Sequence, residues 1–249
     1  MNTSFTCVGC GKCCRDHHVP LTLVEARDWA RSGGNVIVLA EAFLANGLGI
    51  SESQREHALR RSAVVRSGNT DLHLAITFAA FNPGACRNLD SENLCTIYDT
   101  RPLVCRIYPM EINPHIPLNP SAKECPPESW ESGTPLIVGS TLVDLELAQL
   151  IERSRQADRD DIGAKVAICE RLGIQVTALK GDGFTAYLPD MAAFSAALQQ
   201  VEPNAAPASN THWTLHLSGP DVAQQVQSQG ALATVEGAAS YTFIPLRAA

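Results

Sequence analysis

The sequence lacks several features that would place it in a familiar class of protein. None of its apolar runs approaches the roughly 18–20 residues that a membrane-spanning helix needs, so we expect no membrane association. Residues 1–20 lack the apolar stretch and small-residue cleavage site of a secretory signal, which leads us to expect a cytoplasmic protein. No segment recurs along the chain, which argues against a solenoid.

Common catalytic motifs and an excess of positive charge are also absent. The chain has no P-loop, no Gly-x-Gly-x-x-Gly after a strand, no His-Glu-x-x-His and no Gly-x-Ser-x-Gly, so these enzyme classes receive no support. It carries 19 Lys and Arg against 26 Asp and Glu, a formal net charge of −7. Neither half of the chain is basic, and we therefore expect no nucleic-acid partner.

What is present is an ordinary globular composition, with 249 residues of which 45% are hydrophobic and 18% charged. Hydrophobic periodicity and turn signals predict an α+β protein. Helices are expected over about 22–32, from Pro102, and over 140–156, 159–172 and 190–200. Strands are expected over 36–40, 58–66, 71–80, 174–179, 184–188, 212–217 and 240–245, with hairpins at 58–80 and 174–188.

These elements suggest two regions. Residues 1–133 are expected to form a cysteine-rich metal-binding domain with short helices and a hairpin. Residues 134–249 are expected to form a mainly helical C-terminal region with short strands and no assigned role, interrupted by a polar linker over 203–210. Two local signals are specific: Thr22 with Glu25 has the form of a capping box, and the second strand of the first hairpin alternates apolar with polar positions.

Cysteine is the distinctive component of the sequence. Eight of the nine cysteines lie within residues 1–125, and in a reducing compartment such density favours metal thiolates or redox chemistry over disulfides. The eight candidate ligands are Cys7, Cys10, Cys13, Cys14, Cys86, Cys95, Cys105 and Cys125. Cys169 lies among apolar residues of an expected helix, so we assign it to core packing.

The N-terminal cysteines have the spacing Cys-x2-Cys-x2-Cys-Cys, which lets one loop wrap around a metal centre, and Gly9 and Gly11 supply the flexibility. Side chains of neighbouring residues usually point apart, so we expect Cys13 and Cys14 not to share one small ion. Either one of them serves a second site, or the centre is a cluster of several metal atoms. Two four-thiolate sites, or one cluster with a separate metal or spare thiols, remain open.

Charged and histidine residues accompany the cysteines. Lys12, Arg15, Arg87 and Arg106 each adjoin a cysteine, where they either offset the negative charge of a thiolate centre or form ordinary solvated surface. His17 and His18 follow the N-terminal cysteines and could complete a mixed site, although a surface or supporting role is favoured because eight thiols are available.

Three segments together carry a resemblance to a known family. Phe5–Cys14, then Leu21-Thr22 with Glu25, then Cys95–Pro109, resemble the YkgJ-like CxxCxxCC cysteine-cluster family of zinc- or iron-chelating proteins, over roughly residues 5–130. The resemblance implies metal binding. Relatives include flagellin lysine N-methylases, so it also raises the alternative of an S-adenosylmethionine-dependent protein lysine N-methylase, whose carboxylate-binding candidates here are Arg87, Arg101 and Arg106.

Taken together, we favour an iron–sulfur cluster, of the [4Fe–4S] type, over zinc, because the doubled cysteine suits a multi-atom cluster and the chain lacks the paired knuckles of a zinc ribbon. Three functions compete: a redox, sensing or maturation protein, an iron–sulfur-dependent methylase, and a zinc-stabilised interaction module. The partners would be the metal centre and a redox partner or protein substrate. Against the methylase stands the alternative that Arg101 and Arg106 merely pair with Asp99 or Glu111, or satisfy helix ends.

Overall fold

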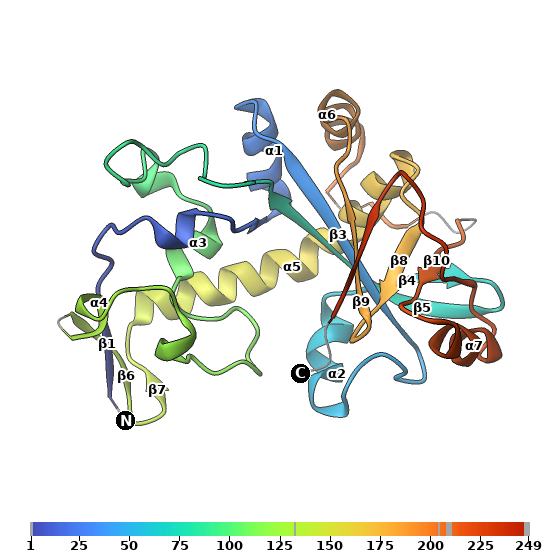
Figure 1. Ribbon diagram of the computed structural model, residues 1–249, viewed down its shortest axis with the longest axis horizontal. Coiled ribbons are helices and arrows are strands. Elements are labelled where there is room, and N and C mark those ends of the chain that lie inside the picture. The colour runs from blue at the N-terminus through green and yellow to red at the C-terminus, as the bar shows by residue number, and fades with distance from the viewer. Residues whose placement is uncertain (1, 132, 204, 208–210, 247–249) are drawn as a thin grey trace. The chain divides into compact units, whose positions relative to one another are not determined.

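The computed structural model describes residues 2–131, 133–203, 205–207 and 211–246, and its contacts divide the chain into two compact units (Figure 1). Unit 1 consists of Met1–Leu21 and Ala80–Gln156, and unit 2 of Thr22–Ala79 and Ala157–Ala249. Helices and strands occur in both, which confirms the α+β class. The boundary expected near residue 133 concerned the extent of the metal-binding region, and it stays a prediction.

Unit 1 contains eight of the nine cysteines, and apart from the first part of α5 (Leu145–Arg171) its regular elements are short. Its three-stranded antiparallel sheet has the order β1 (Thr3–Phe5), β6 (Thr134–Val138), β7 (Thr141–Leu142). The other elements are the 3₁₀ turns η1 (Lys12–Cys14), η2 (Tyr98–Thr100) and η3 (Pro120–Ala122), strand β2 (Val19–Leu21), and helices α3 (Leu103–Ile107) and α4 (Glu128–Glu131). Loops therefore hold most of the candidate ligands.

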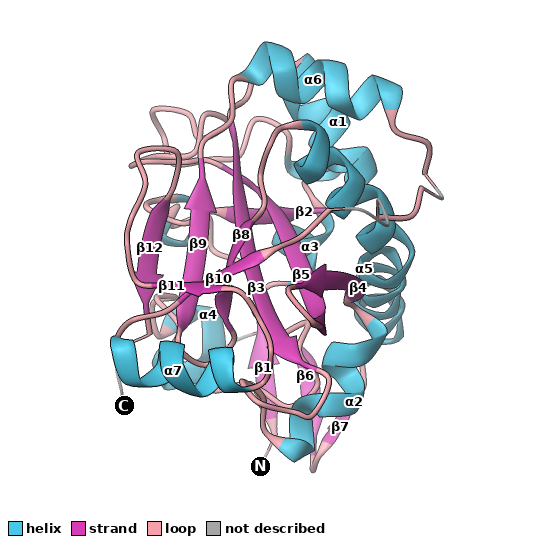
Figure 2. Ribbon diagram, turned by 90° about the vertical axis from the view of Figure 1, so that its right-hand side faces the viewer, coloured by secondary structure: helices cyan, strands magenta, loops and turns pink. Residues whose placement is uncertain are grey.

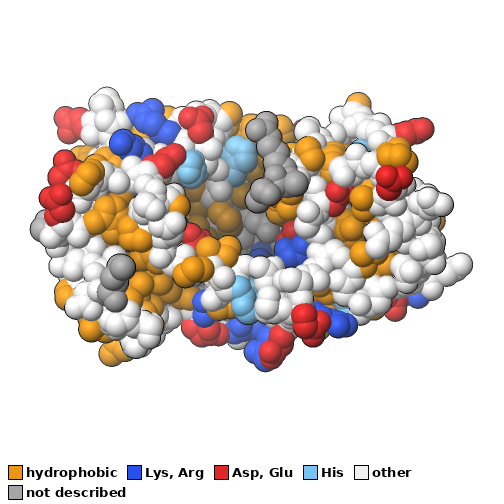
Figure 3. Space-filling model, turned by 60° about the horizontal axis from the view of Figure 1, so that its bottom comes forward, with side chains coloured by type: hydrophobic (Ala, Val, Ile, Leu, Met, Phe, Trp, Pro, Cys, Tyr) orange, Lys and Arg blue, Asp and Glu red, His pale blue; other side chains and the backbone are white. Residues whose placement is uncertain are grey.

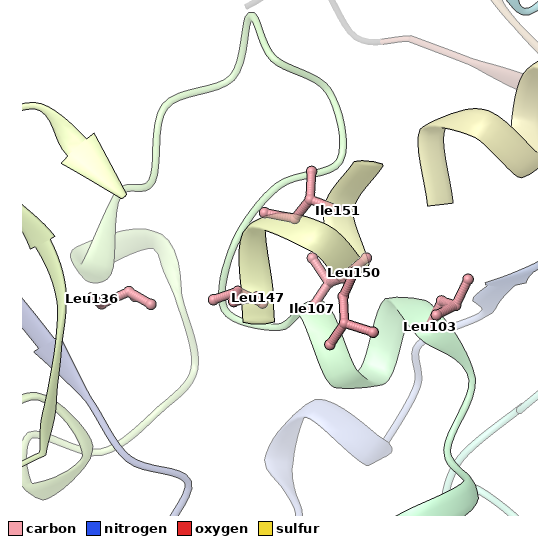
Figure 4. Close-up of a cluster of buried hydrophobic side chains, with 6 residues drawn as sticks. All are labelled: Leu103, Ile107, Leu136, Leu147, Leu150 and Ile151. Carbon is pink, nitrogen blue, oxygen red and sulfur yellow. The ribbon is translucent and has the colours of Figure 1, made fainter. Parts of the chain in front are cut away.

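A small apolar cluster anchors α3 in unit 1 against the first turns of α5 (Leu145–Arg171), as Figure 4 shows. Its buried members are Leu103, Ile107, Leu136, Leu147, Leu150 and Ile151. Leu103 and Ile107 are four residues apart and share one face of α3, which brings both to the cluster. Cys105 lies between them, on the opposite face of the same helix.

Unit 2 is built on a mixed sheet, seen face-on in Figure 2. Its strands follow the order β11 (Ala233–Thr234), β10 (Thr214–His216), β8 (Val176–Leu179), β3 (Val36–Leu44), β5 (Thr70–Ala80). Strand β4 (Ala63–Ser67) pairs antiparallel with β5, and β9 (Gly183–Tyr187) pairs antiparallel with β3 and β12 (Thr242–Pro245). The helices of this unit are α1 (Leu23–Arg31), α2 (Glu52–Arg60), α6 (Met191–Gln200), α7 (Pro220–Ser228) and the second part of α5.

Several expectations for unit 2 are confirmed. Helix α1 begins with the capping box, in which the Thr22 hydroxyl accepts from the Glu25 N–H and the Glu25 carboxylate accepts from the Thr22 N–H. Helix α6 begins where Asp190 caps the Ala193 N–H. The alternating residues of β5, Leu72 to Phe78, are buried, and Cys169 is fully buried as expected for core packing.

Other expectations are wrong. Residues 145–171 form one helix instead of two, because the stretch around Gln156 contains no Gly, Pro or cap to end it. The segment from Glu52 to Arg60 is helical, so the first strand of the hairpin begins only at Ala63. Strands β8 and β9 exist, but β8 pairs with β10 and β3, whereas β9 pairs with β3 and β12.

The description of residues 134–249 as mainly helical is also a correction. The described residues of this part of the chain form seven strands, β6 to β12. Strands β6, β7 and β11 lie outside the segments expected to be strands. These short segments become strands because neighbouring strands satisfy their backbone groups. Residues 204 and 208–210 of the expected linker lie outside the described residues.

Two surface properties bear on the expected partners. Within the described ranges, no helix combines the length and the apolar character that crossing a membrane requires. On the face drawn in Figure 3, described Lys and Arg side chains are interspersed with Asp and Glu side chains. Charges of both signs thus share this face.

The apolar cluster of unit 1 can be tested with one matched pair of substitutions on α5. Leu150→Ala removes a side chain that is 8% exposed, and we expect it to lower the free energy of unfolding by about 2–5 kcal/mol. Leu145→Ala removes the same atoms from a side chain that is 76% exposed, and should change the free energy by less than about 0.5 kcal/mol. Urea unfolding measures both, and equal effects would contradict the cluster.

Candidate metal centre

The N-terminal cysteine run is shaped by two glycines with positive φ. Gly9 has φ 67° and Gly11 has φ 69°, a backbone region that residues with a Cβ rarely adopt. A Cβ on Gly11 would also lie 2.9 Å from the Cβ of Asn93, and one on Gly9 would lie 3.0 Å from Leu94 Cδ2. The run is therefore folded tightly against the turn at residues 93–94.

Gly11 is the residue from which the turn η1 starts, and η1 brings the doubled cysteines into contact. The Cys14 N–H donates to the Gly11 carbonyl at 3.1 Å, and the Sγ atoms of Cys13 and Cys14 lie 3.9 Å apart. Our expectation that these neighbours point apart is therefore wrong. The hydrogen bond between the Cys13 and Cys14 thiols raises the pKa of Cys13 and lowers that of Cys14.

A second loop is joined to the run by backbone pairing. The Asp16 N–H donates to Gly84 O and the Cys86 N–H donates to Cys14 O, both at 2.7 Å. Further along, Leu89 and Cys95 form an antiparallel bridge, and the Thr96 N–H donates to Asn88 O at 2.8 Å. Cys14, Cys86 and Cys95 are therefore held by one connected set of backbone contacts.

Cys105 reaches the same neighbourhood from α3. Burial raises its pKa to about 12, and the next largest contributions come from the negative charges of Cys14 and Cys86. Burial likewise raises the pKa of Cys86, on which Cys14 and Cys95 also act. The electrostatic neighbours of Cys105 are thus the thiols of the second loop together with Cys14.

Cys125 lies near Cys7 and Cys10 of the N-terminal run. The Thr6 N–H donates to Ser129 O at 2.9 Å and the Ser129 N–H to Pro126 O at 3.0 Å, which ties the residue before Cys7 to the turn after Cys125. The Cys125 thiol donates to the Tyr108 hydroxyl at 3.3 Å. Burial raises the pKa of Cys125, and the charges of Cys10 and Cys7 add to the increase.

The donor set suits a thiolate-bound metal centre. All eight candidate cysteines are free thiols, exposed or half-buried, and they are gathered in one unit from four stretches of sequence. Among the described residues, no three cysteine, histidine or acidic side chains converge as the ligands of one metal ion. The thiols are therefore close neighbours that metal binding would have to draw together.

The histidines beside the run have other contacts. His17 Nδ1 lies 2.7 Å from Arg15 O, and its Nε2 lies 4.0 Å from the Glu124 carboxylate. His18 Nδ1 accepts from the Asn82 N–H at 3.2 Å, and its ring packs against Phe81. His18 therefore helps to hold the loop before Cys86, and ligation by either histidine stays a prediction.

Arg101 is positioned by an aromatic side chain. Its guanidinium carbon lies 3.5 Å from the centre of the Tyr98 ring, and its Nε donates to Tyr98 O at 2.7 Å. Its charge also lowers the pKa of Cys14, more than those of His17 and Arg15 do. Arg15 donates to Asn93 Oδ1 at 2.7 Å.

A cavity of about 470 Å³ in unit 1 includes Arg101 and Arg106 in its lining, together with Tyr98, Tyr108 and Glu146. The third arginine candidate, Arg87, is not among the lining residues. Glu111 pairs with Lys123, and within the described part of unit 1 neither Arg101 nor Arg106 forms an ion pair with it or with Asp99. The assignment of these arginines to cofactor binding stays a prediction.

The sequence analysis did not predict the contacts of Tyr98 and Tyr108. The contact between Tyr98 and Arg101 could have been predicted from the sequence, because residues three apart meet across a short 3₁₀ turn. The contact between Tyr108 and Cys125 could not, because seventeen residues in a proline-rich segment separate them.

The tight packing of the N-terminal run leads to a test with two glycines. Gly11→Ala introduces both a positive-φ strain of about 1–2 kcal/mol and the close approach to Asn93, so we expect reduced stability and at least a several-fold loss of bound metal. Gly139→Ala has the same strain at φ 67° with open space around the Cβ, and should retain the metal. Elemental analysis with urea unfolding compares them; equal metal content would contradict the packing argument.

Comparison with known proteins agrees with this donor set. Searches of curated proteins and of solved structures gave no match to this chain. One family model matches residues 6–126, a range that contains all eight candidate ligands, and its description is "Putative zinc- or iron-chelating domain". Residues 6–126 of this chain therefore match the CxxCxxCC family model.

Proposed function

We propose that unit 1 holds an iron–sulfur cluster, of the [4Fe–4S] type, and that the protein acts as a redox protein. The observation that carries the proposal is the contact of the Cys13 and Cys14 thiols at 3.9 Å, with six further thiols gathered in the same unit. A closed structural zinc site needs only four thiolates. Eight thiols in one unit exceed what a single structural zinc ion requires, and this favours iron–sulfur chemistry.

Positive charge near the thiols supports a strongly anionic centre. A four-iron cluster with four thiolates carries about two negative charges, which neighbouring cations offset while they also stabilise the thiolate form of cysteine. Arg101 and Arg15 act on Cys14 in this way. Lys123 lies over the ring of Tyr108, whose hydroxyl binds Cys125.

The exposure of the thiols supports a redox role. Cys7 is exposed and the other seven candidate ligands are half-buried, so none is enclosed in a core as Cys169 is. An iron–sulfur cluster, when bound, supplies one-electron chemistry whose potential depends on charge, hydrogen bonds and solvent exposure. A partner protein can approach thiols in this position, and sensing or cluster maturation would use the same accessibility.

Anaerobic purification of the full chain tests this proposal. We expect brown protein containing iron and acid-labile sulfide, with visible absorption that bleaches on reduction by dithionite. The double variant Cys7→Ser/Cys10→Ser should lose at least half of the iron, whereas the control Cys169→Ser should retain all of it because that thiol is buried in unit 2. Colourless protein with stoichiometric zinc and no sulfide, even after reconstitution, would instead support a zinc-stabilised interaction module.

A second candidate function, iron–sulfur-dependent protein lysine N-methylation, is favoured by the cavity. Arg101 and Arg106 line it, and a guanidinium can hold a carboxylate through two parallel hydrogen bonds. Glu146 and the rings of Tyr98 and Tyr108 line the same cavity and suit the cationic part of a zwitterion. S-adenosylmethionine carries both groups, and a protein lysine would be the methyl acceptor.

Calorimetric titration with S-adenosylmethionine under anaerobic conditions tests the methylase. If this function is correct, metal-loaded protein binds the compound, and Arg106→Ala weakens binding at least tenfold because the carboxylate loses a charged partner. Arg87→Ala serves as the control, since Arg87 lies outside the cavity lining. Absence of binding by the metal-loaded wild-type protein removes this candidate and leaves the redox proposal untouched.

A further inference from the structure

We infer that the eight thiols form two adjacent four-thiolate centres. Cys13 belongs to one centre and its neighbour Cys14 belongs to the other. The first set comprises Cys7, Cys10, Cys13 and Cys125. The second set comprises Cys14, Cys86, Cys95 and Cys105. The inference rests on metal binding by unit 1, but it is independent of whether zinc or an iron–sulfur cluster is bound.

Backbone contacts define the second set. The bond from the Cys86 N–H to Cys14 O fixes these two residues beside each other, and the Arg15–Ala85 bridge lies between that bond and the bond from Asp16 to Gly84. The bridge between Leu89 and Cys95 folds the loop back on itself. Cys105 joins this set from the face of α3 that points away from the apolar cluster.

A different group of contacts defines the first set. Thr6, which precedes Cys7, is bonded to Ser129, and the turn from Pro126 to Ser129 follows Cys125 directly. The ring of Phe5 packs on Trp130 with centroids 4.9 Å apart, which keeps the two segments together. Cys10 and Cys13 belong to the same loop as Cys7, shaped by the positive φ of Gly9 and Gly11.

Electrostatic influence among the thiols follows the same two sets, apart from the pair Cys13 and Cys14 at their junction. After the hydrogen bond with Cys14 and burial, the charge that acts most on Cys13 is that of Cys14, and the next two are those of Cys7 and Cys125. Those that act most on Cys105 are Cys14 and Cys86, with Cys95 also among the five largest causes. The 3.9 Å contact is the junction between the sets.

Each set has the composition of a closed site. Four thiolates satisfy a tetrahedral zinc ion or a four-iron cluster without an open position, and each thiol releases its proton when it binds. The adjacency of Cys13 and Cys14 would place the two centres next to each other. For iron–sulfur clusters, this arrangement permits electron exchange between them within one unit.

Metal stoichiometry with site-resolved thiol protection tests the division. Full-length protein is loaded anaerobically, either with zinc or by iron–sulfur reconstitution, then alkylated with iodoacetamide and mapped by mass spectrometry. Wild-type protein should hold two centres with all eight thiols protected. Cys125→Ser should lose half of the metal and expose only the rest of the first set, and Cys105→Ser should expose only the rest of the second. Cys169→Ser is the control with both centres intact.

Stepwise removal of metal from the wild-type protein by a chelator supplies a measurement that needs no variant to fold. The thiols should become reactive as two groups of four with the stated membership. A single protected group, or reactivity that mixes members of both sets, would overturn the division while leaving an iron–sulfur function intact. Two groups of four that take up zinc, but take up no iron and sulfide during reconstitution, would retain the division and refute the iron–sulfur proposal. A protein that binds no metal would refute both.

Discussion

The contact between the thiols of Cys13 and Cys14 is the constraint on which the candidate metal centre depends. It exists because Gly11 takes up a left-handed conformation and starts a 3₁₀ turn, in which two consecutive side chains are brought within 3.9 Å. Cys14 is at the same time paired through its backbone with Cys86. One short turn therefore connects the N-terminal run to the loop that carries two further thiols.

The surrounding unit positions its donors with little regular structure. Loops carry most of the thiols, and three anchors hold these loops in place: the apolar cluster under α3, the ring of Phe5 on Trp130, and the Tyr108 hydroxyl on Cys125. A small core leaves the thiols accessible to solvent. Bound metal would add cross-links to this unit, and it would therefore contribute to its stability.

Unit 2 has a different character. Its sheet and helices bury a substantial core, including the fully buried Trp213, Phe43 and Phe194, and its one cysteine is part of that core. Helix α5 contributes residues to both units, since Leu147 and Leu150 belong to unit 1 whereas Ile162 and Val166 belong to unit 2. The apolar periodicity of the sequence placed the C-terminal end of this helix within one residue, but it placed the start at residue 140, before the strand β7. It also missed the continuity of the helix, because each half satisfies the pattern of a complete helix.

The sequence alone determined the features that depend on near neighbours along the chain. These are the capping box of Thr22 and Glu25, the buried face of β5, the helix expected over residues 190–200, and the thiol-rich chemistry of residues 7–125. Tertiary structure decided which strands pair with β8 and β9, and which thiols are neighbours of Cys14, Cys105 and Cys125. The physical reason is distance along the chain: a cysteine's spacing constrains its contacts over a few residues, whereas bonds such as Cys86 to Cys14 form between segments that meet only when the whole unit folds.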